Sequence, residues 1–193
     1  MPARRLQIAG VVLAGGRARR FGGDKALALL EGRPLIERSL DALRGRAEPL
    51  AVNGPAALAA AVGLPAIADP PGLAEGPLAG ILAAMAWAKA MGCSRVLTVP
   101  CDTPILPRDL AARLIAAGAS APAAAARAER AHALCGLWSL ELAEAVAPLA
   151  GRPRQPAVAA VLEAVGGVWV DFPDEAQFAN LNTREDLERA RVS

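Results

Sequence analysis

The residues best suited to chemistry stand in a glycine-rich, basic stretch that directly follows an apolar run. The run is Ile8–Leu13, and the stretch reads Ala14-Gly15-Gly16-Arg17-Ala18-Arg19-Arg20-Phe21-Gly22-Gly23-Asp24-Lys25. Glycines let backbone N–H groups approach anionic oxygens without a Cβ in the way, arginines bind phosphate through paired hydrogen bonds, and lysine adds a compact charge. A glycine turn with solvated arginines is the alternative, but the spacing favours a loop that binds phosphate.

The stretch matches neither of two common nucleotide-binding motifs. It contains no G-x-G-x-x-G, and Lys25 is followed by Ala26 instead of the Ser or Thr that a P-loop requires. Dehydrogenase and P-loop interpretations are therefore disfavoured.

A second candidate for chemistry is Asp102, which follows the apolar run Val96–Val99. If this run is a buried strand of a parallel sheet, Asp102 lies at the same sheet edge as the glycine-rich stretch. Mg²⁺ commonly takes one or two protein carboxylates and completes its shell with water and phosphate oxygens. An Asp before Thr-Pro also suits a plain turn, but beside a phosphate-binding loop the metal interpretation is favoured. Its neighbour Cys101 has no identifiable base, so we expect a small buried side chain there.

Apolar periodicity and turn residues divide the first part of the chain into alternating strands and helices. We expect strands at 8–13, 50–52, 66–68 and 95–99, and helices at 34–45, 77–91 and 107–117. This order predicts a parallel sheet with helices on both faces, because parallel strands need long crossover connections. The fold class expected is α/β, a three-layer α/β/α arrangement of Rossmann-like type.

The second part of the chain has a looser pattern. Apolar segments at 121–126 and 133–138 flank the charged stretch Arg127–Arg130, which is typical of an antiparallel hairpin. Further on we expect helices at 141–149 and 157–165, a strand at 168–172, and a last helix opened by a capping box of Thr183 and Asp186. The sheet should thus be mostly parallel, with an antiparallel excursion in the C-terminal half.

Composition limits the class of protein. The 193 residues are 54% hydrophobic and 21% charged, so the chain can bury a core, and we expect one domain over 1–193. A net charge of +2 gives no concentrated electric field, so the composition does not indicate a nucleic-acid or membrane partner. The three cysteines lack metal or redox spacing, and no apolar run reaches a membrane-spanning length, so we expect a cytoplasmic protein.

Several motifs, taken in order, resemble those of the molybdenum cofactor guanylyltransferases. They are LAGGRARRFGGDK with PLIERSL, then GPLAGILAAM, PCDTPILPRDLAARL and FANLNTREDLERA. The glycine-rich stretch alone is typical of the wider nucleotidyltransferase superfamily, whereas LAGG, GPLAG, PCDTP and the NxNT ending together are more specific. The resemblance spans nearly the whole chain.

The resemblance implies site residues of three kinds. Lys25 and Asp102 would be catalytic, and Asp102 would also bind Mg²⁺. GTP would be bound by Leu13, Ala14, Gly15, Gly16, Lys25, Asn53, Asp69 and Asp102. Molybdopterin would be bound by Arg19, Gly22, Arg154, Asn180 and Asn182. Because the chain has His132-Ala133 where the family often has His-Pro, the resemblance gives its only histidine no role, and we expect a structural side chain.

The resemblance also implies an activity. GMP would pass from GTP to the terminal phosphate of metal-loaded molybdopterin, with residues 1–118 mainly binding the nucleotide and 119–193 mainly the pterin. Molybdopterin insertase and molybdoenzyme chaperones are the protein partners implied. Three alternatives stay open. One is the sister cytidylyltransferase, which typically has LAAG in place of LAGG; the others are a sugar-1-phosphate nucleotidylyltransferase and a noncatalytic chaperone that binds nucleotide and pterin.

Overall fold

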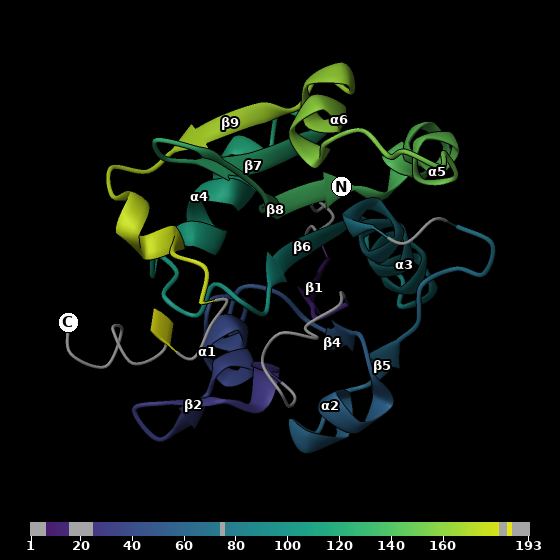
Figure 1. Cartoon of the computed structure of the whole chain (residues 1–193). Coiled ribbons are helices and arrows are strands. Elements are labelled where there is room, and N and C mark those ends of the chain that lie inside the picture. The colour runs from purple at the N-terminus through teal and green to yellow at the C-terminus, as the bar shows by residue number, and fades with distance from the viewer. Residues whose placement is uncertain (1–6, 16–24, 74–75, 182–184, 187–193) are drawn as a thin grey trace, which may run out of the picture.

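A seven-stranded sheet forms the centre of the protein (Figure 1). The computed structural model describes residues 7–15, 25–73, 76–181 and 185–186. In the order of the sheet the strands are β5 (Ala66–Ile67), β4 (Leu50–Asn53), β1 (Ile8–Leu13), β6 (Arg95–Pro100), β8 (Ala131–Ser139), β7 (Ala123–Arg127) and β9 (Val168–Asp171). Neighbouring strands pair in parallel except at β8, which runs antiparallel to β6 and β7. The predicted mostly parallel sheet with an antiparallel excursion is confirmed.

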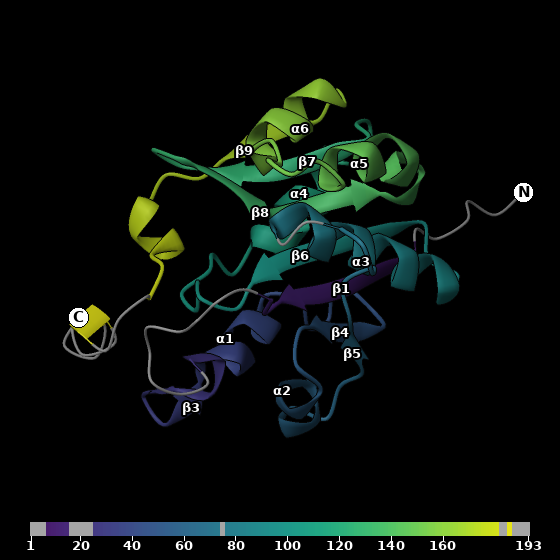
Figure 2. The ribbon, with the colours of Figure 1, turned by 45° about the vertical axis from the view of Figure 1, so that its right-hand side comes forward.

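Helices cover both faces of this sheet (Figure 2). They are α1 (Leu35–Asp41), α2 (Ala56–Ala61), α3 (Pro77–Ala90), α4 (Leu110–Ala117), α5 (Ala143–Ala150) and α6 (Val158–Ala164). One apolar cluster contains residues of α3, α5 and α6, and the other contains residues of α1, α2 and α4. Strand β1 serves both, since Val11 packs in the first cluster and Val12 in the second. The three-layer α/β/α prediction is therefore confirmed.

Prolines mark the starts of three helices. Pro34 and Pro55 precede α1 and α2, and Pro77 is the first residue of α3. Proline suits these positions because its φ is fixed near the helical value and a first-turn N–H has no partner within the helix. The expected helix at 107–117 instead begins at Leu110, because the Leu110 N–H bonds to the Pro107 carbonyl and closes a turn first.

The longest described helix, α3, lies deepest in the protein. Its 14 residues include a run from Leu78 to Met85 that is buried throughout, between the sheet and α5. Such all-round hydrophobicity is typical of a helix enclosed by protein. No helix within the described residues combines the length and the apolar character needed to cross a membrane.

Some elements differ from the prediction. A short hairpin of β2 (Leu29–Leu30) and β3 (Arg33–Pro34) precedes α1, and its turn residues Glu31 and Gly32 have φ values of 51° and 77°. Such angles suit a two-residue hairpin turn. The expected helix at 141–149 is two elements, η2 (Leu140–Leu142) and α5. Thr183 of the predicted capping box lies outside the described residues.

Candidate functional site

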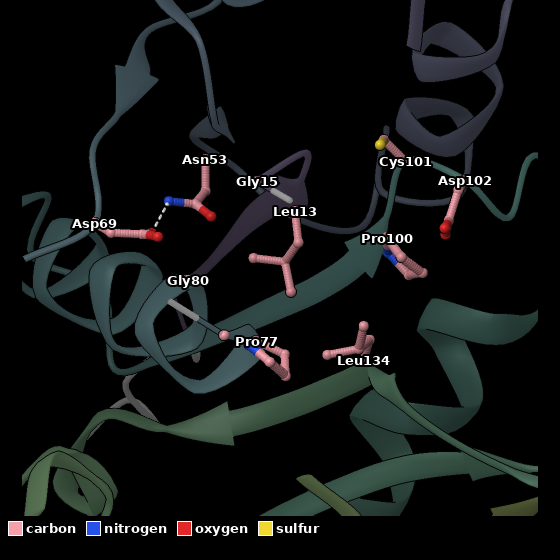
Figure 3. A pocket seen from close by; sticks show the side chains of 11 residues that line it. Leu13, Gly15, Asn53, Asp69, Pro77, Gly80, Pro100, Cys101, Asp102 and Leu134 are labelled. Atoms are coloured by element: carbon pink, nitrogen blue, oxygen red, sulfur yellow. Dashed lines mark hydrogen bonds between the residues drawn. The ribbon is translucent and has the colours of Figure 1, made fainter. Parts of the chain in front are cut away.

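A cleft of about 470 Å³ opens at the carboxyl ends of the parallel strands (Figure 3). Its size falls in the range of small-molecule sites. Strands β1, β4 and β6 end there, and the segment that follows β5 borders it. The lining residues are Leu13, Gly15, Asn53, Asp69, Gly76, Pro77, Gly80, Pro100, Cys101, Asp102 and Leu134. The predicted meeting of the Gly15 stretch and Asp102 at one sheet edge is confirmed.

The backbone after β1 is fixed by its two neighbouring strands. The Ala14 N–H donates to the Asn53 carbonyl over 2.8 Å, and the Leu13 carbonyl accepts from the Cys101 N–H over 3.0 Å. These two hydrogen bonds extend the pairing of β1 with β4 and with β6 beyond the end of β1. They hold the backbone so that Gly15 lines the cleft. The predicted site residues Gly16, Arg19 and Gly22 lie outside the described residues.

Asn53 and Asp69 form a hydrogen-bonded pair on one wall. Asn53 is 3% exposed, and its Nδ2 donates to the Ile67 carbonyl over 3.1 Å and to Asp69 Oδ1 over 2.8 Å. Because both neighbours are acceptors, the amide orientation is determined, and Oδ1 points away from them (Figure 3). A Cβ built on Gly15 would lie 3.5 Å from Asn53 Oδ1, and one built on Gly80 only 2.6 Å from it. The glycines leave this acceptor accessible from the cleft.

Lys25 and Asp102 form an ion pair at the other wall. Lys25, the first residue of η1 (Lys25–Leu27), places Nζ 3.4 Å from Asp102 Oδ2. The Lys25 side chain is 10% exposed and that of Asp102 is 32% exposed. The lysine is thus held inside the protein while the carboxylate reaches the cleft.

Asn180 lies directly behind Asp102. It accepts a hydrogen bond of 2.6 Å from the Thr103 hydroxyl, and the next residue, Leu181, donates its N–H to the Asp102 carbonyl over 2.9 Å. The structure therefore brings Asn180 beside the Asp102 wall of the cleft, although Asn180 lies 77 positions after Thr103. Asn182 lies outside the described residues.

Arg154 lies in the loop between α5 and α6 and is not among the residues that line the cleft. Its side chain is exposed, and the adjacent Gln155 touches Gly76, where a Cβ would meet Gln155 Oε1 at 2.2 Å. Arg154 and Asn180 thus belong to segments at different sides of the cleft, close to Gly76 and to Asp102 respectively.

Sequence reasoning missed several lining residues. Gly76, Pro77 and Gly80 belong to GPLAG, and Pro100 and Cys101 to PCDTP, so their motifs were noticed while their positions in the cleft were not. Cys101 is half-buried at the cleft rather than fully buried, which corrects the expectation above. Leu134 carries no sequence signal. It reaches the cleft because the pairing of β7 with β8 shifts between Ala125 and Ala126.

The donor set fits a divalent cation that is shared with a ligand. Within the described part of the chain, no three His, Cys, Asp or Glu side chains gather to hold a metal ion. Two carboxylates line the cleft: Asp69 is exposed and accepts a bond from Asn53, and Asp102 is 32% exposed and pairs with Lys25. Because Asp69 is tied to Asn53 on the opposite wall, a cation at Asp102 would have one protein carboxylate. One carboxylate suits Mg²⁺ when phosphates and water complete its shell.

Comparison with known proteins agrees with this geometry. A family model described as MobA-like NTP transferase domain matches residues 10–167. The chain belongs to this family. A curated relative from Cereibacter sphaeroides, named molybdenum cofactor guanylyltransferase, is 44% identical over 190 residues, 96% of either chain. A relative of the same name from Acidiphilium cryptum (strain JF-5) is 40% identical over 186 residues, 94% of this chain and 93% of the relative. This MobA-like protein is therefore a nucleotidyltransferase.

Solved structures share the MobA-like fold. Molybdopterin-guanine dinucleotide biosynthesis protein A from Archaeoglobus fulgidus superposes with a TM-score of 0.75 at 20% identity, covering 95% of this chain and 97% of that one. Rv0371C from Mycobacterium tuberculosis, in complex with manganese, superposes with a TM-score of 0.67 at 21% identity, covering 97% of this chain and 99% of that one. At such identities the likeness establishes the fold.

Proposed function

We propose that the protein transfers GMP from GTP to the terminal phosphate of metal-loaded molybdopterin. An acceptor phosphate oxygen forms a bond to the α-phosphorus of GTP. The bond from that phosphorus to the oxygen bridging to the β-phosphorus breaks, and pyrophosphate leaves with the electron pair. The observation that carries the proposal is the single cleft shared by Gly15, the Asn53–Asp69 pair and Asp102, in a chain 44% identical to a guanylyltransferase.

The Asn53–Asp69 wall favours binding of a purine base that carries hydrogen-bond donors on its edge. Guanine carries an exocyclic N2–H₂ donor, and the two residues offer acceptor oxygens, one of them fixed in orientation. The glycine at position 15 supports guanine over cytosine, since the sister cytidylyltransferases typically have alanine there. A methyl group at that position would stand 3.5 Å from Asn53 Oδ1 and narrow the space beside it.

The Lys25–Asp102 pair supports transfer between two anions. In the free protein each neutralises the other. With GTP and Mg²⁺ bound, Lys25 would contact the phosphates and Asp102 would hold the cation, so each charge would exchange one partner of opposite sign for another. The cation would supply neutralisation of the phosphate oxygens. Lys25 and the backbone N–H groups beyond Leu13 would align the triphosphate.

The acceptor side would be formed by Asn180 and Arg154, with Arg19, Gly22 and Asn182 from outside the described residues. Asn180 lies beside the Asp102 loop and Arg154 near Gly76, so an acceptor contacting both would cross the cleft over Leu134. The acceptor phosphate is already ionised at neutral pH, so no protein base has to remove a proton from it. The protein's task is therefore to bring two phosphates together and to neutralise them.

Pyrophosphate release tests the proposal. Purified protein is mixed with metal-loaded molybdopterin and Mg²⁺, and GTP, CTP, ATP or UTP is added separately. We expect release with GTP and a dinucleotide product of matching mass. Preference for CTP would assign the sister activity, and binding of GTP and pterin without pyrophosphate would assign a noncatalytic carrier.

A further inference from the structure

A segment near the C-terminus connects the far end of the sheet to the cleft. We call Glu175–Leu181 the strap. It begins with η3 (Glu175–Phe178) after β9 and runs toward α1 (Figures 1 and 2). It ends at the Thr103–Asn180 and Leu181–Asp102 hydrogen bonds described above. The position of Asn180 beside Asp102 therefore depends on what holds the strap.

Two apolar side chains fix the depth of the strap. Phe178 is 1% exposed and packs edge-on against Phe172, with ring centroids 5.4 Å apart. Leu181 is 4% exposed and packs with Leu30 and Leu35. Such contacts are strong but nondirectional, so they do not by themselves set the strap's lengthwise position.

His132, near the start of β8, makes two directional contacts with the strap. Its ring is stacked on Phe178, with centroids 4.3 Å apart and planes 14° from parallel. Its Nε2 lies 3.0 Å from Glu175 Oε2. A carboxylate only accepts hydrogen bonds, so Nε2 carries the proton. One imidazole thus holds both ends of η3.

Arg130 also contacts Glu175, but from a weaker position. Its Nε donates to Glu175 Oε1 over 2.8 Å, and its backbone N–H donates to Oε2 over 3.2 Å. The Arg130 side chain is 77% exposed, whereas those of His132 and Glu175 are each 16% exposed. Solvent and salt weaken an exposed pair more than a half-buried one. The hydrogen bond from His132 is the largest cause that lowers the pKa of Glu175 to about 2, so Glu175 is ionised at neutral pH.

We infer that His132 is a positioning residue for acceptor binding: through Glu175 and Phe178 it holds the strap so that Asn180 stays beside Asp102. The inference rests on the proposed function, in which Asn180 binds the acceptor. His132 itself lies on β8 and is not among the residues that line the cleft. It therefore acts through the strap and not on the reacting atoms.

Hydrogen exchange tests the strap without any reaction. His132→Phe keeps a ring to stack on Phe178 and removes the bond to Glu175. We expect strap amides, including the Leu181 N–H, to exchange about tenfold faster in this variant, because one charge-assisted hydrogen bond is lost from the local opening equilibrium. The matched control is Asp171→Asn, which weakens the 2.7 Å Arg127–Asp171 pair at the same sheet edge and should leave strap exchange unchanged.

Kinetics test the consequence for the site. We expect His132→Phe to raise the KM for metal-loaded molybdopterin about tenfold while the KM for GTP stays within about twofold, because Asn180 is the strap's one proposed ligand residue and Leu181 contacts the backbone carbonyl of Asp102 and not its carboxylate. His132→Gln, which restores an N–H donor, should recover part of the loss. If His132→Phe does not fold, Glu175→Gln weakens the same contact from the strap side.

The outcomes separate the two claims. Unchanged strap exchange in His132→Phe overturns the inference, and so does an equal rise of both KM values, which would indicate general destabilisation. If the wild-type protein transfers no nucleotide to molybdopterin, the proposed function fails, and with it the acceptor role of Asn180. The exchange experiment still decides whether His132 holds the strap.

Discussion

At the scale of single residues, Asp102 is the carboxylate of the cleft that pairs with Lys25, and we expect it to hold the cation. Asp102→Ala should lower the rate of pyrophosphate release by about a hundredfold or more, since losing one well-placed group that stabilises charge in the transition state typically costs this much. The rate is measured at rising Mg²⁺. Asp109→Ala is the matched control, because that carboxylate is 60% exposed and lies outside the cleft, 3.7 Å from Arg113. Full activity of Asp102→Ala at saturating Mg²⁺ would exclude the metal role.

Lys25 is expected to act on the phosphates. Lys25→Ala should lower kcat/KM for GTP by an amount equivalent to about 3 kcal/mol, the usual contribution of one aligned donor in a water-poor site. Lys25→Arg should restore little, because a planar guanidinium cannot replace a compact ammonium 3.4 Å from Asp102. Steady-state kinetics measure kcat/KM for GTP in both variants. A wild-type kcat/KM for Lys25→Ala would exclude this residue from the mechanism.

Glu175 links the strap to the acid stability of the protein. Its pKa is lowered from 4.5 in the unfolded chain to about 2 in the folded protein. A lowered folded-state pKa stabilises the fold above the unfolded value, and this stabilisation is lost as the pH falls from about 4.5 toward about 2. Urea denaturation at pH 6 and pH 3 should therefore show a smaller loss of unfolding free energy for Glu175→Gln than for wild type. An equal loss in both proteins would contradict this assignment.

At the scale of elements, α3 carries a glycine that the Asn53 wall requires. Gly80→Ala places a methyl carbon where 2.6 Å separates it from Asn53 Oδ1, so the amide has to turn away. We expect the KM for GTP to rise about tenfold, a change of about 1.4 kcal/mol, with the fold intact by circular dichroism. Ala86→Ser on the exposed side of the same helix is the control. An unchanged KM in Gly80→Ala would mean that Asn53 does not contact the nucleotide.

An element could be predicted from the sequence when its own residues carried a clear pattern. The strands β1 and β6 were predicted closely, because a strand buried on both faces is a continuous apolar run. Helix α2 was not, since its sequence Ala56–Ala61 is alanine with one leucine in a chain where alanine is common. The β2–β3 hairpin has two-residue strands, too short to show alternation.

The same distinction applies to the site. The glycine-rich stretch and Asp102 could be predicted from their residue types after an apolar run, and the structure places Gly15 and Asp102 at one sheet edge. The contacts of His132 with Glu175 and of Thr103 with Asn180 join residues 43 and 77 positions apart. Only the packed tertiary structure specifies such pairs, because neither partner has a local pattern that points to the other.

At the scale of the whole molecule, the cleft joins the ends of β1, β4 and β6, so a ligand that spans it should stabilise the fold. With GTP and Mg²⁺ at about a hundred times their dissociation constants, linkage gives about 2.7 kcal/mol, or roughly 5–10 °C in Tm for a chain of this size. Differential scanning calorimetry measures the shift. Asp102→Ala should lose the part of the shift that depends on Mg²⁺, whereas a shift that is independent of Mg²⁺ in wild type would contradict a shared cation.

The reversed direction of β8 sets the Leu134 side of the cleft apart from the sides formed by the parallel strands. Because β8 is antiparallel to β6, its amino half meets the cleft through Leu134, and β8 is reached from β7 by the hairpin between Arg127 and Ala131 and not by a crossover connection. A hairpin tolerates insertions and deletions at its tip without moving the helices that complete the layers. Changes in this hairpin can therefore reshape the Leu134 side of the cleft while the ends of β1, β4 and β6 keep their positions, which leaves one ancestral scaffold free to acquire new ligands.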